Sequence, residues 1–130
     1  MKRLDLVPKS KGDIATAEAA VRAGYPAVDS VLPELLEWLQ DYNWPVAKIL
    51  APFLASVGTP LVPHLKRIIE GRDQVWKYWV ISCVLEKMQS AACEPLLPLV
   101  ERIAASPTRE EKIDEVDQVA SELLSRFQTK

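Results

Sequence analysis

A short pattern recurs three times along the chain and restricts it to a small set of folds. Each copy places a proline directly after an aliphatic residue and a hydrophobic pair five residues further on. The prolines, which are 30 and then 35 residues apart, are Pro33, Pro63 and Pro98. Ten residues after each proline stands a residue that caps helices well, and these are Asn43, Asp73 and Thr108. Self-similarity at this period is typical of stacked helix pairs, in which no single pair buries its apolar face alone.

Hydrophobic periodicity and helix-capping residues predict an all-α chain of about seven helices, one leading helix and three helix pairs. No segment alternates apolar and polar residues between turn signals, so we expect no strands. The predicted helices span 13–22, which Asp13 caps, 28–40, 43–57, 61–70, 75–88, 96–104 and 108–126. We therefore expect one domain over residues 1–130, folded as a right-handed α-α superhelix of about three and a half helix pairs.

Two of these helices carry specific expectations. The helix over 75–88 is apolar nearly all round, which predicts a central helix covered on several sides. The last helix begins with the capping box of Thr108 and Glu111 and continues into an apolar stripe that starts at Ile113. Its first turns are acidic and are expected to lie in water near the positive end of the helix dipole, with an acid/base pair as the alternative. These carboxylates are Glu110, Glu111, Asp114, Glu115 and Asp117.

Composition excludes several classes of protein. Of 130 residues, 48% are hydrophobic and 26% charged, which is typical of a globular rather than a disordered chain. A net charge of −2 offers no broad attraction to nucleic acid or anionic lipid. No apolar run approaches the roughly 18 residues of a membrane span, and the N-terminus is too charged for a signal peptide. Two cysteines and one histidine make neither a disulfide framework nor a zinc site. We therefore expect a cytoplasmic protein with reduced Cys83 and Cys93 and without metal or cofactor.

The residues that could carry catalysis are few. His64 is the only histidine, and its position early in a helix, away from the apolar stripe, predicts a solvated surface residue. The glycines are scattered at helix ends and form no phosphate-binding loop. We therefore assign no catalytic residue and favour a protein without catalysis, while the question of enzymatic activity stays open.

One edge of the predicted superhelix collects the candidate binding residues. The starts of neighbouring repeats line up there, and Trp44 and Trp76 stand at matching helix starts. Lys77 lies on a helix with few polar residues and is predicted to pair with Asp41. The cluster is either a ladder of ion pairs and caps that fixes the stacking or a notch that binds an anion or a peptide end. Its members are Asp41, Asn43, Trp44, Trp76 and Lys77. Lys9 and Lys11 of the basic lead-in either contribute to the same notch or form a solvated segment before the first helix.

Two segments of the chain resemble a small bacterial family of domains of unknown function. They are Asn43-Trp44-Pro45-Val46-Ala47 and Trp76-Lys77-Tyr78-Trp79, and the lead-in over 8–13 is also similar to the start of that family. The resemblance extends over essentially the whole chain. It implies a compact superhelix of HEAT or armadillo type and implies no catalytic role. It also directs attention to the candidate cluster, because the family's motif falls on those residues.

Three functions are compatible with these observations. We rank first an interaction module that docks an unknown protein or peptide, as a monomer or a weak dimer, because short helical solenoids offer extended surfaces. The alternative is a small-ligand protein or enzyme with a pocket for an acidic metabolite at the helix-start edge. DNA binding ranks last, because acidic residues interrupt the basic cluster. Together with the net charge of −2, this leads us to expect neither nucleic acid nor membrane as a partner. That basic cluster is Lys66, Arg67, Arg72 and Lys77.

Overall fold

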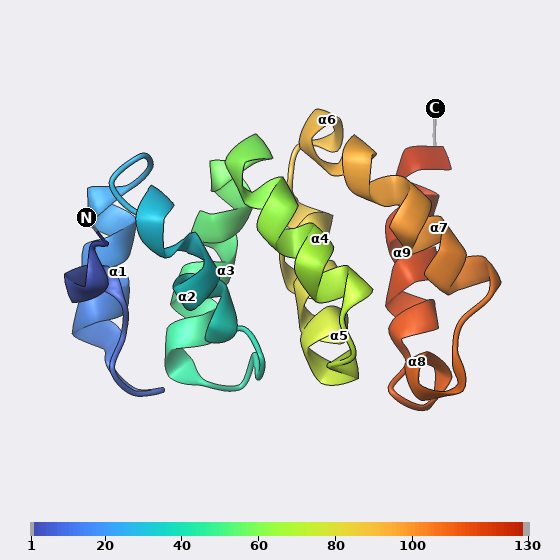
Figure 1. Ribbon diagram of the computed structural model, residues 1–130, viewed down its shortest axis with the longest axis horizontal. Coiled ribbons are helices and arrows are strands. Elements are labelled where there is room, and N and C mark those ends of the chain that lie inside the picture. Colours follow the sequence, from blue (N-terminus) through green and yellow to red (C-terminus); the bar gives the residue numbers. More distant parts are fainter. Residues whose placement is uncertain (1, 129–130) are drawn as a thin grey trace.

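A computed structural model describes residues 2–128, and this part of the chain is helical without any strand (Figure 1). The α-helices are α1 (Ile14–Ala23), α2 (Leu32–Glu37), α3 (Pro45–Val57), α4 (Val62–Glu70), α5 (Gln74–Cys83), α6 (Ser90–Cys93), α7 (Leu97–Ala105), α8 (Arg109–Ile113) and α9 (Val116–Gln128). Short 3-10 turns accompany them, namely η1 (Leu4–Leu6), η2 (Asp29–Val31), η3 (Thr59–Leu61), η4 (Leu85–Lys87) and η5 (Glu94–Leu96).

The recurring proline pattern builds the same local structure three times. Pro33, Pro63 and Pro98 lie in the first turns of α2, α4 and α7, and a 3-10 turn directly precedes each of these helices. A proline fits at that position because the N–H that it lacks would have no partner inside the helix. The sequence pattern therefore marks three equivalent units, each a 3-10 turn followed by an α-helix.

The helices follow one another along the long axis of the molecule, from α1 at the left of Figure 1 to α7 and α9 at the right. Helix α1 packs on α3, α5 packs on α4 and α9, and α7 packs on α4 and α9. One apolar core runs through these contacts. Each large side chain that is fully buried there contributes about 1.5–3 kcal/mol. The largest are Leu32, Leu35, Leu36, Leu39, Leu50, Leu54, Leu61, Leu65, Ile69, Ile81, Leu85 and Leu96.

Three of the predicted helix caps are confirmed and one is wrong. Asp13 and Asp73 accept hydrogen bonds from the first turns of α1 and α5, and Thr108 forms the predicted capping box with Glu111. Asn43 does not cap α3. Its backbone N–H instead donates to the carboxylate of Asp41 over 2.8 Å, which closes a local turn before the helix.

The helix predicted over 108–126 is broken in two. Helix α8 ends at Ile113, α9 begins at Val116, and Glu115 between them has a φ of 61°. Glu111 and Val116 are both buried, but on one continuous helix they would point about 140° apart. The break lets both side chains turn inward. It also moves Ile113 out of the predicted apolar stripe, and this side chain is 67% exposed.

Helix α3 is a long apolar element and continues through Pro52. Within residues 2–128, no helix by itself has the length and apolar character needed to cross a membrane. The segments Pro45–Val57 and Thr59–Glu70 meet that criterion only when taken together, and the chain bends by 110° between them.

Candidate binding site

Lys77 and Glu111 form a buried ion pair that joins α5 to α8. Lys77 is 3% exposed and Glu111 is not exposed at all. The ammonium of Lys77 donates to the Glu111 carboxylate over 3.0 Å, and Arg102 of α7 donates to both carboxylate oxygens over 2.6 and 2.8 Å. The backbone N–H of Thr108 adds a further hydrogen bond of 2.8 Å. One carboxylate therefore ties together three helices.

Two predictions about this region are wrong. Lys77 pairs with Glu111 and not with Asp41, whose carboxylate accepts from the backbone of Asn43. Glu111 is buried rather than part of a solvated acidic helix start. The Arg102 guanidinium has the largest effect on the pKa of Glu111 and lowers it, and hydrogen bonds from the Thr108 backbone and from Lys77 lower it further. These contacts outweigh burial, which raises the pKa, and bring it to about 2. The carboxylate is therefore charged at neutral pH, as an ion pair in the core requires.

A hollow of about 440 Å³ opens beside this ion pair. Three of the side chains that line it are cationic and three are anionic, so the hollow offers no net charge that would select an acidic ligand. These are Arg72, Lys77 and Arg102, and Glu70, Glu110 and Glu111. The arrangement supports a structural role for Lys77 more than a ligand-binding one.

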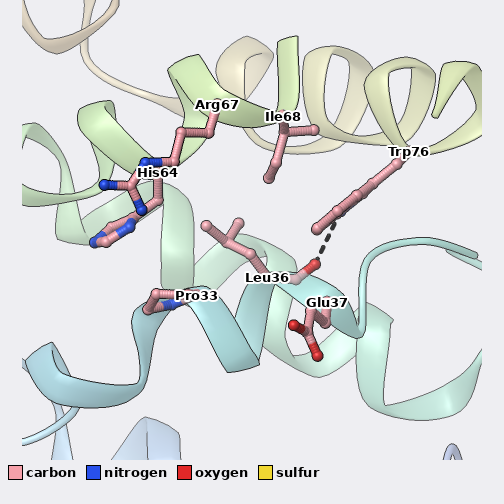
Figure 2. A pocket seen from close by; sticks show the side chains of 7 residues that line it. All are labelled: Pro33, Leu36, Glu37, His64, Arg67, Ile68 and Trp76. Atoms are coloured by element: carbon pink, nitrogen blue, oxygen red, sulfur yellow. Dashed lines mark hydrogen bonds between the residues drawn. The ribbon is translucent and has the colours of Figure 1, made fainter. Parts of the chain in front are cut away.

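Trp76 belongs to a different hollow, on the other side of α5. Its indole N–H donates to the backbone carbonyl of Leu36 over 3.0 Å, which fastens the start of α5 to the end of α2 (Figure 2). The ring forms one wall of a hollow of about 160 Å³ between α2 and α4. The other lining residues are Pro33, Leu36, Glu37, His64, Arg67 and Ile68.

His64 lies in this hollow and is not the solvated surface residue that the sequence predicts. It is half-buried, and within the described chain its Nδ1 has no hydrogen-bond partner. Burial, and then the nearby Arg67 guanidinium, lowers the pKa of the imidazole, so His64 is neutral at pH 7. Figure 2 shows Arg67 extending along α4 toward this imidazole.

The remaining predicted site residues serve the connections between helices. Trp44 packs its ring against Trp38, with centroids 5.7 Å apart. The backbone N–H of Lys9 donates to the Asp13 carboxylate, and the backbone carbonyl of Lys11 accepts from Val46. The structure thus does not gather the predicted cluster in one place, since Trp76 lines one hollow and Lys77 lines another.

Residues 6–124 match the profile of a family described as a domain of unknown function, DUF5071. The chain belongs to this family. No curated protein matches it significantly. Within the part of the DUF5071 chain that the structure describes, no three His, Cys, Asp or Glu side chains gather as a metal-binding group.

The most unusual surface of this DUF5071 domain is the outward side of α5. The sequence predicts that α5 is covered on several sides, and α4, α9 and the end of α2 cover all but its outward side. Lys77, Val80 and Ile81 are buried, whereas Val75 is 46% exposed. Tyr78, Trp79 and Cys83 lie on the same side as Val75, at helical spacing, and are partly buried. An apolar helix side is therefore partly open to solvent.

Aromatic contacts extend this surface beyond α5. The ring of Trp79 lies 4.9 Å from that of Tyr78 and 5.6 Å from that of Tyr42, which precedes α3. The exposed Ile113 at the end of α8 borders Trp79 in a hollow of about 340 Å³. We call this surface the α5 face, formed by Tyr42, Val75, Tyr78, Trp79, Cys83 and Ile113.

The sequence contains one signal of the α5 face, which is the apolar character of the segment 75–88 nearly all round. An apolar helix side is equally compatible with burial inside the domain and with exposure for a partner. Tyr42 and Ile113 carried no separate signal, because the loop before α3 and the break after α8 bring them to the face.

Proposed function

We propose that this DUF5071 domain is a protein-interaction module without catalytic activity, which binds its partner through the α5 face. The observation that supports this is one continuous surface on which the exposed Val75 and Ile113 border the partly buried rings of Tyr78 and Trp79. Tryptophan and tyrosine are enriched among the residues that carry most of the energy of protein interfaces. Isolated exposed apolar residues are common, but a contiguous patch usually marks an interaction site.

The proposed scaffold is a short right-handed superhelix of HEAT or armadillo type. Its support is the unit of a 3-10 turn followed by an α-helix, which occurs three times along the chain, together with the packing of α4 on α5 and of α7 on α9. Such stacks expose long surfaces for binding. The proposed location is the cytoplasm, where free thiols such as those of Cys83 and Cys93 stay reduced.

Affinity capture from a lysate of the source cells tests the interaction module. The bait carries the wild-type sequence, Trp79→Ala or Ile113→Ala, with circular dichroism to establish that each variant is folded. Leu4→Ala is the matched control, since Leu4 is 58% exposed on η1, outside the α5 face. We expect a protein that is retained by wild type and Leu4→Ala and lost with both face variants; a second copy of the chain counts as such a partner. Equal retention by all baits would refute the α5 face as the binding surface.

A second candidate function is the binding of a small acid in the hollow of Figure 2. Its support is the unpartnered Nδ1 of His64, next to the cationic Arg67 and the apolar floor of Leu36 and Ile68. The carboxylate of the lining, Glu37, is on α2, across the hollow from His64 and Arg67 on α4. A volume of about 160 Å³ is below the usual range of about 300–1,000 Å³ for ligand pockets, so only a carboxylate with a short apolar tail fits.

Titration with butyrate, followed through the indole N–H signal of Trp76 by NMR, tests this second candidate. We expect a saturable shift with butyrate, none with butylamine, and loss of the shift in Arg67→Met. The control is Arg72→Met, which removes an exposed arginine outside this hollow. An unchanged butyrate response in Arg67→Met would rule the site out.

A further inference from the structure

We infer that the partner covering the α5 face is a second copy of this chain, packed antiparallel so that the acidic end of each face meets the basic end of the other. This inference rests on the proposed function of the α5 face. It follows from the charges at the two ends of that face and from the position of Trp79 between them.

The end of the face at the start of α5 is acidic. Asp114 and Glu115 line the hollow next to Val75 and Trp79, and both side chains are exposed. Neither pairs with a cation anywhere in residues 2–128. Lys112 is the cation of the same turn; it is exposed and forms no ion pair in the described chain. Two free carboxylates therefore border the apolar centre on this side.

The other end of the face, beyond Cys83, is basic. Lys87 lines a hollow of about 360 Å³ together with Tyr42 and Cys83. The ammonium of Lys48 lies 6.0 Å from the centre of the Tyr42 ring, and both lysines are exposed. Glu86 is the acid next to Lys87 in sequence, and it does not line this hollow. Each lysine is thus available to a carboxylate from outside the chain.

Symmetry makes these two ends complementary. In a twofold dimer each patch meets the same patch of the other copy, so a surface with opposite charges at its ends pairs best with itself in antiparallel orientation. Val75 and Cys83 are about 12 Å apart along the helix, at 1.5 Å per residue, and Trp79 is midway between them. An axis through Trp79 therefore superposes the acidic end on the basic end and brings the two tryptophan rings together.

The expected dimer is reversible. A face only about 12 Å long along α5 falls at the small end of specific interfaces, which bury less than about 1,200 Å² and hold transient complexes. We expect a dissociation constant in the micromolar range, weakened by added salt because the outer contacts are between exposed charges.

Charge exchange and sedimentation velocity test the dimer. The acidic end is reversed in Asp114→Lys/Glu115→Lys, and the basic end in Lys48→Glu/Lys87→Glu. All four positions are exposed, so the fold is expected to persist, and circular dichroism checks this. We expect each double variant alone to dimerise at least tenfold more weakly than wild type, because like charges then meet at both ends.

Mixing the two double variants gives the decisive result. In the mixed dimer every lysine again faces a carboxylate, so we expect dimers in the mixture at concentrations where each variant alone is monomeric. For the same reason, we expect the variant that carries all four substitutions to form a homodimer again. A monomeric wild type at millimolar concentration, or a dimer that neither charge reversal weakens, would overturn the inference. The proposed function fails separately, when Trp79→Ala and Ile113→Ala do not change capture from the lysate.

Discussion

Glu111 shows how a single buried residue organises this domain. Its carboxylate accepts from Lys77 on α5, from Arg102 on α7 and from the backbone before α8. A buried carboxylate without partners would be far too costly to keep charged, and here each oxygen has more than one donor. At the residue scale, the cluster holds α5, α7 and α8 together.

Replacement of Lys77 tests the structural role. Lys77→Met removes one partner of a buried carboxylate, and we expect the free energy of unfolding to fall by about 3 kcal/mol. Urea denaturation measures the change. Lys112→Met, at an exposed site on α8, is the control and should stay within about 0.5 kcal/mol of wild type. A Lys77→Met variant as stable as this control would show that the ion pair contributes nothing.

Acid should weaken the domain through Glu111. The pKa of this carboxyl is about 2 in the folded chain, against an ordinary value of 4.5. The folded state therefore takes up this proton at a lower pH than the unfolded state does. The stabilisation is therefore complete above about pH 4.5 and is lost as the pH falls toward about 2. Urea midpoints between pH 7 and pH 2.5 should fall more steeply for wild type than for Glu111→Gln. Parallel curves for the two proteins would contradict this assignment.

At the scale of secondary-structure elements, the break between α8 and α9 has the largest effect on the surface. It turns Glu111 inward, and it places Ile113, Asp114 and Glu115 at the start of the α5 face. Carboxylates four residues apart, such as Glu110 with Asp114 and Glu111 with Glu115, disfavour a continuous helix across this segment. The local break thus positions Glu111 for the buried ion pair and Ile113 for the α5 face.

The backbone of the break can be tested at Glu115. Its φ of 61° lies in the left-handed region, where glycine is favoured and a β-branched residue is strained. We expect Glu115→Gly to raise the free energy of unfolding by up to about 1 kcal/mol and Glu115→Val to lower it by about 1–2 kcal/mol. Thermal melts of the two variants give the comparison. If valine is tolerated as well as glycine, α8 and α9 form a continuous helix instead.

At the scale of the whole molecule, the domain should unfold as one unit. One core cluster extends from Leu6 to Leu123, and α9 near the end of the chain packs on α5 in its middle. Leu32→Ala and Leu123→Ala each remove a fully buried side chain, and we expect each to lower the free energy of unfolding by about 2–5 kcal/mol. Far-ultraviolet circular dichroism and tryptophan fluorescence should report the same single transition. A separate transition in either variant would reveal independent halves.

Local features of the sequence predicted the helices well. The caps at Asp13, Asp73 and Thr108 depend only on neighbouring residues, and these predictions are confirmed. The partner of Lys77 and the exposure of α5 depend on which helices come together, which a single sequence does not specify. For the same reason the sequence did not show that Trp76 and Lys77 line different hollows, or that Tyr42 and Ile113 join the α5 face.

The separation of Lys77 from Glu111 has a consequence for synthesis of the chain. The two residues are 34 positions apart, and α5 is translated before α8. At about 5–20 residues per second, a ribosome adds Glu111 roughly 2–7 s after Lys77. During that interval Lys77 has no counter-charge, and a buried ammonium without one is costly, so α5 is expected to dock only after the later helices have been made. The ion pair is thus one of the contacts that α5 gains from later parts of the chain, together with its packing on α9.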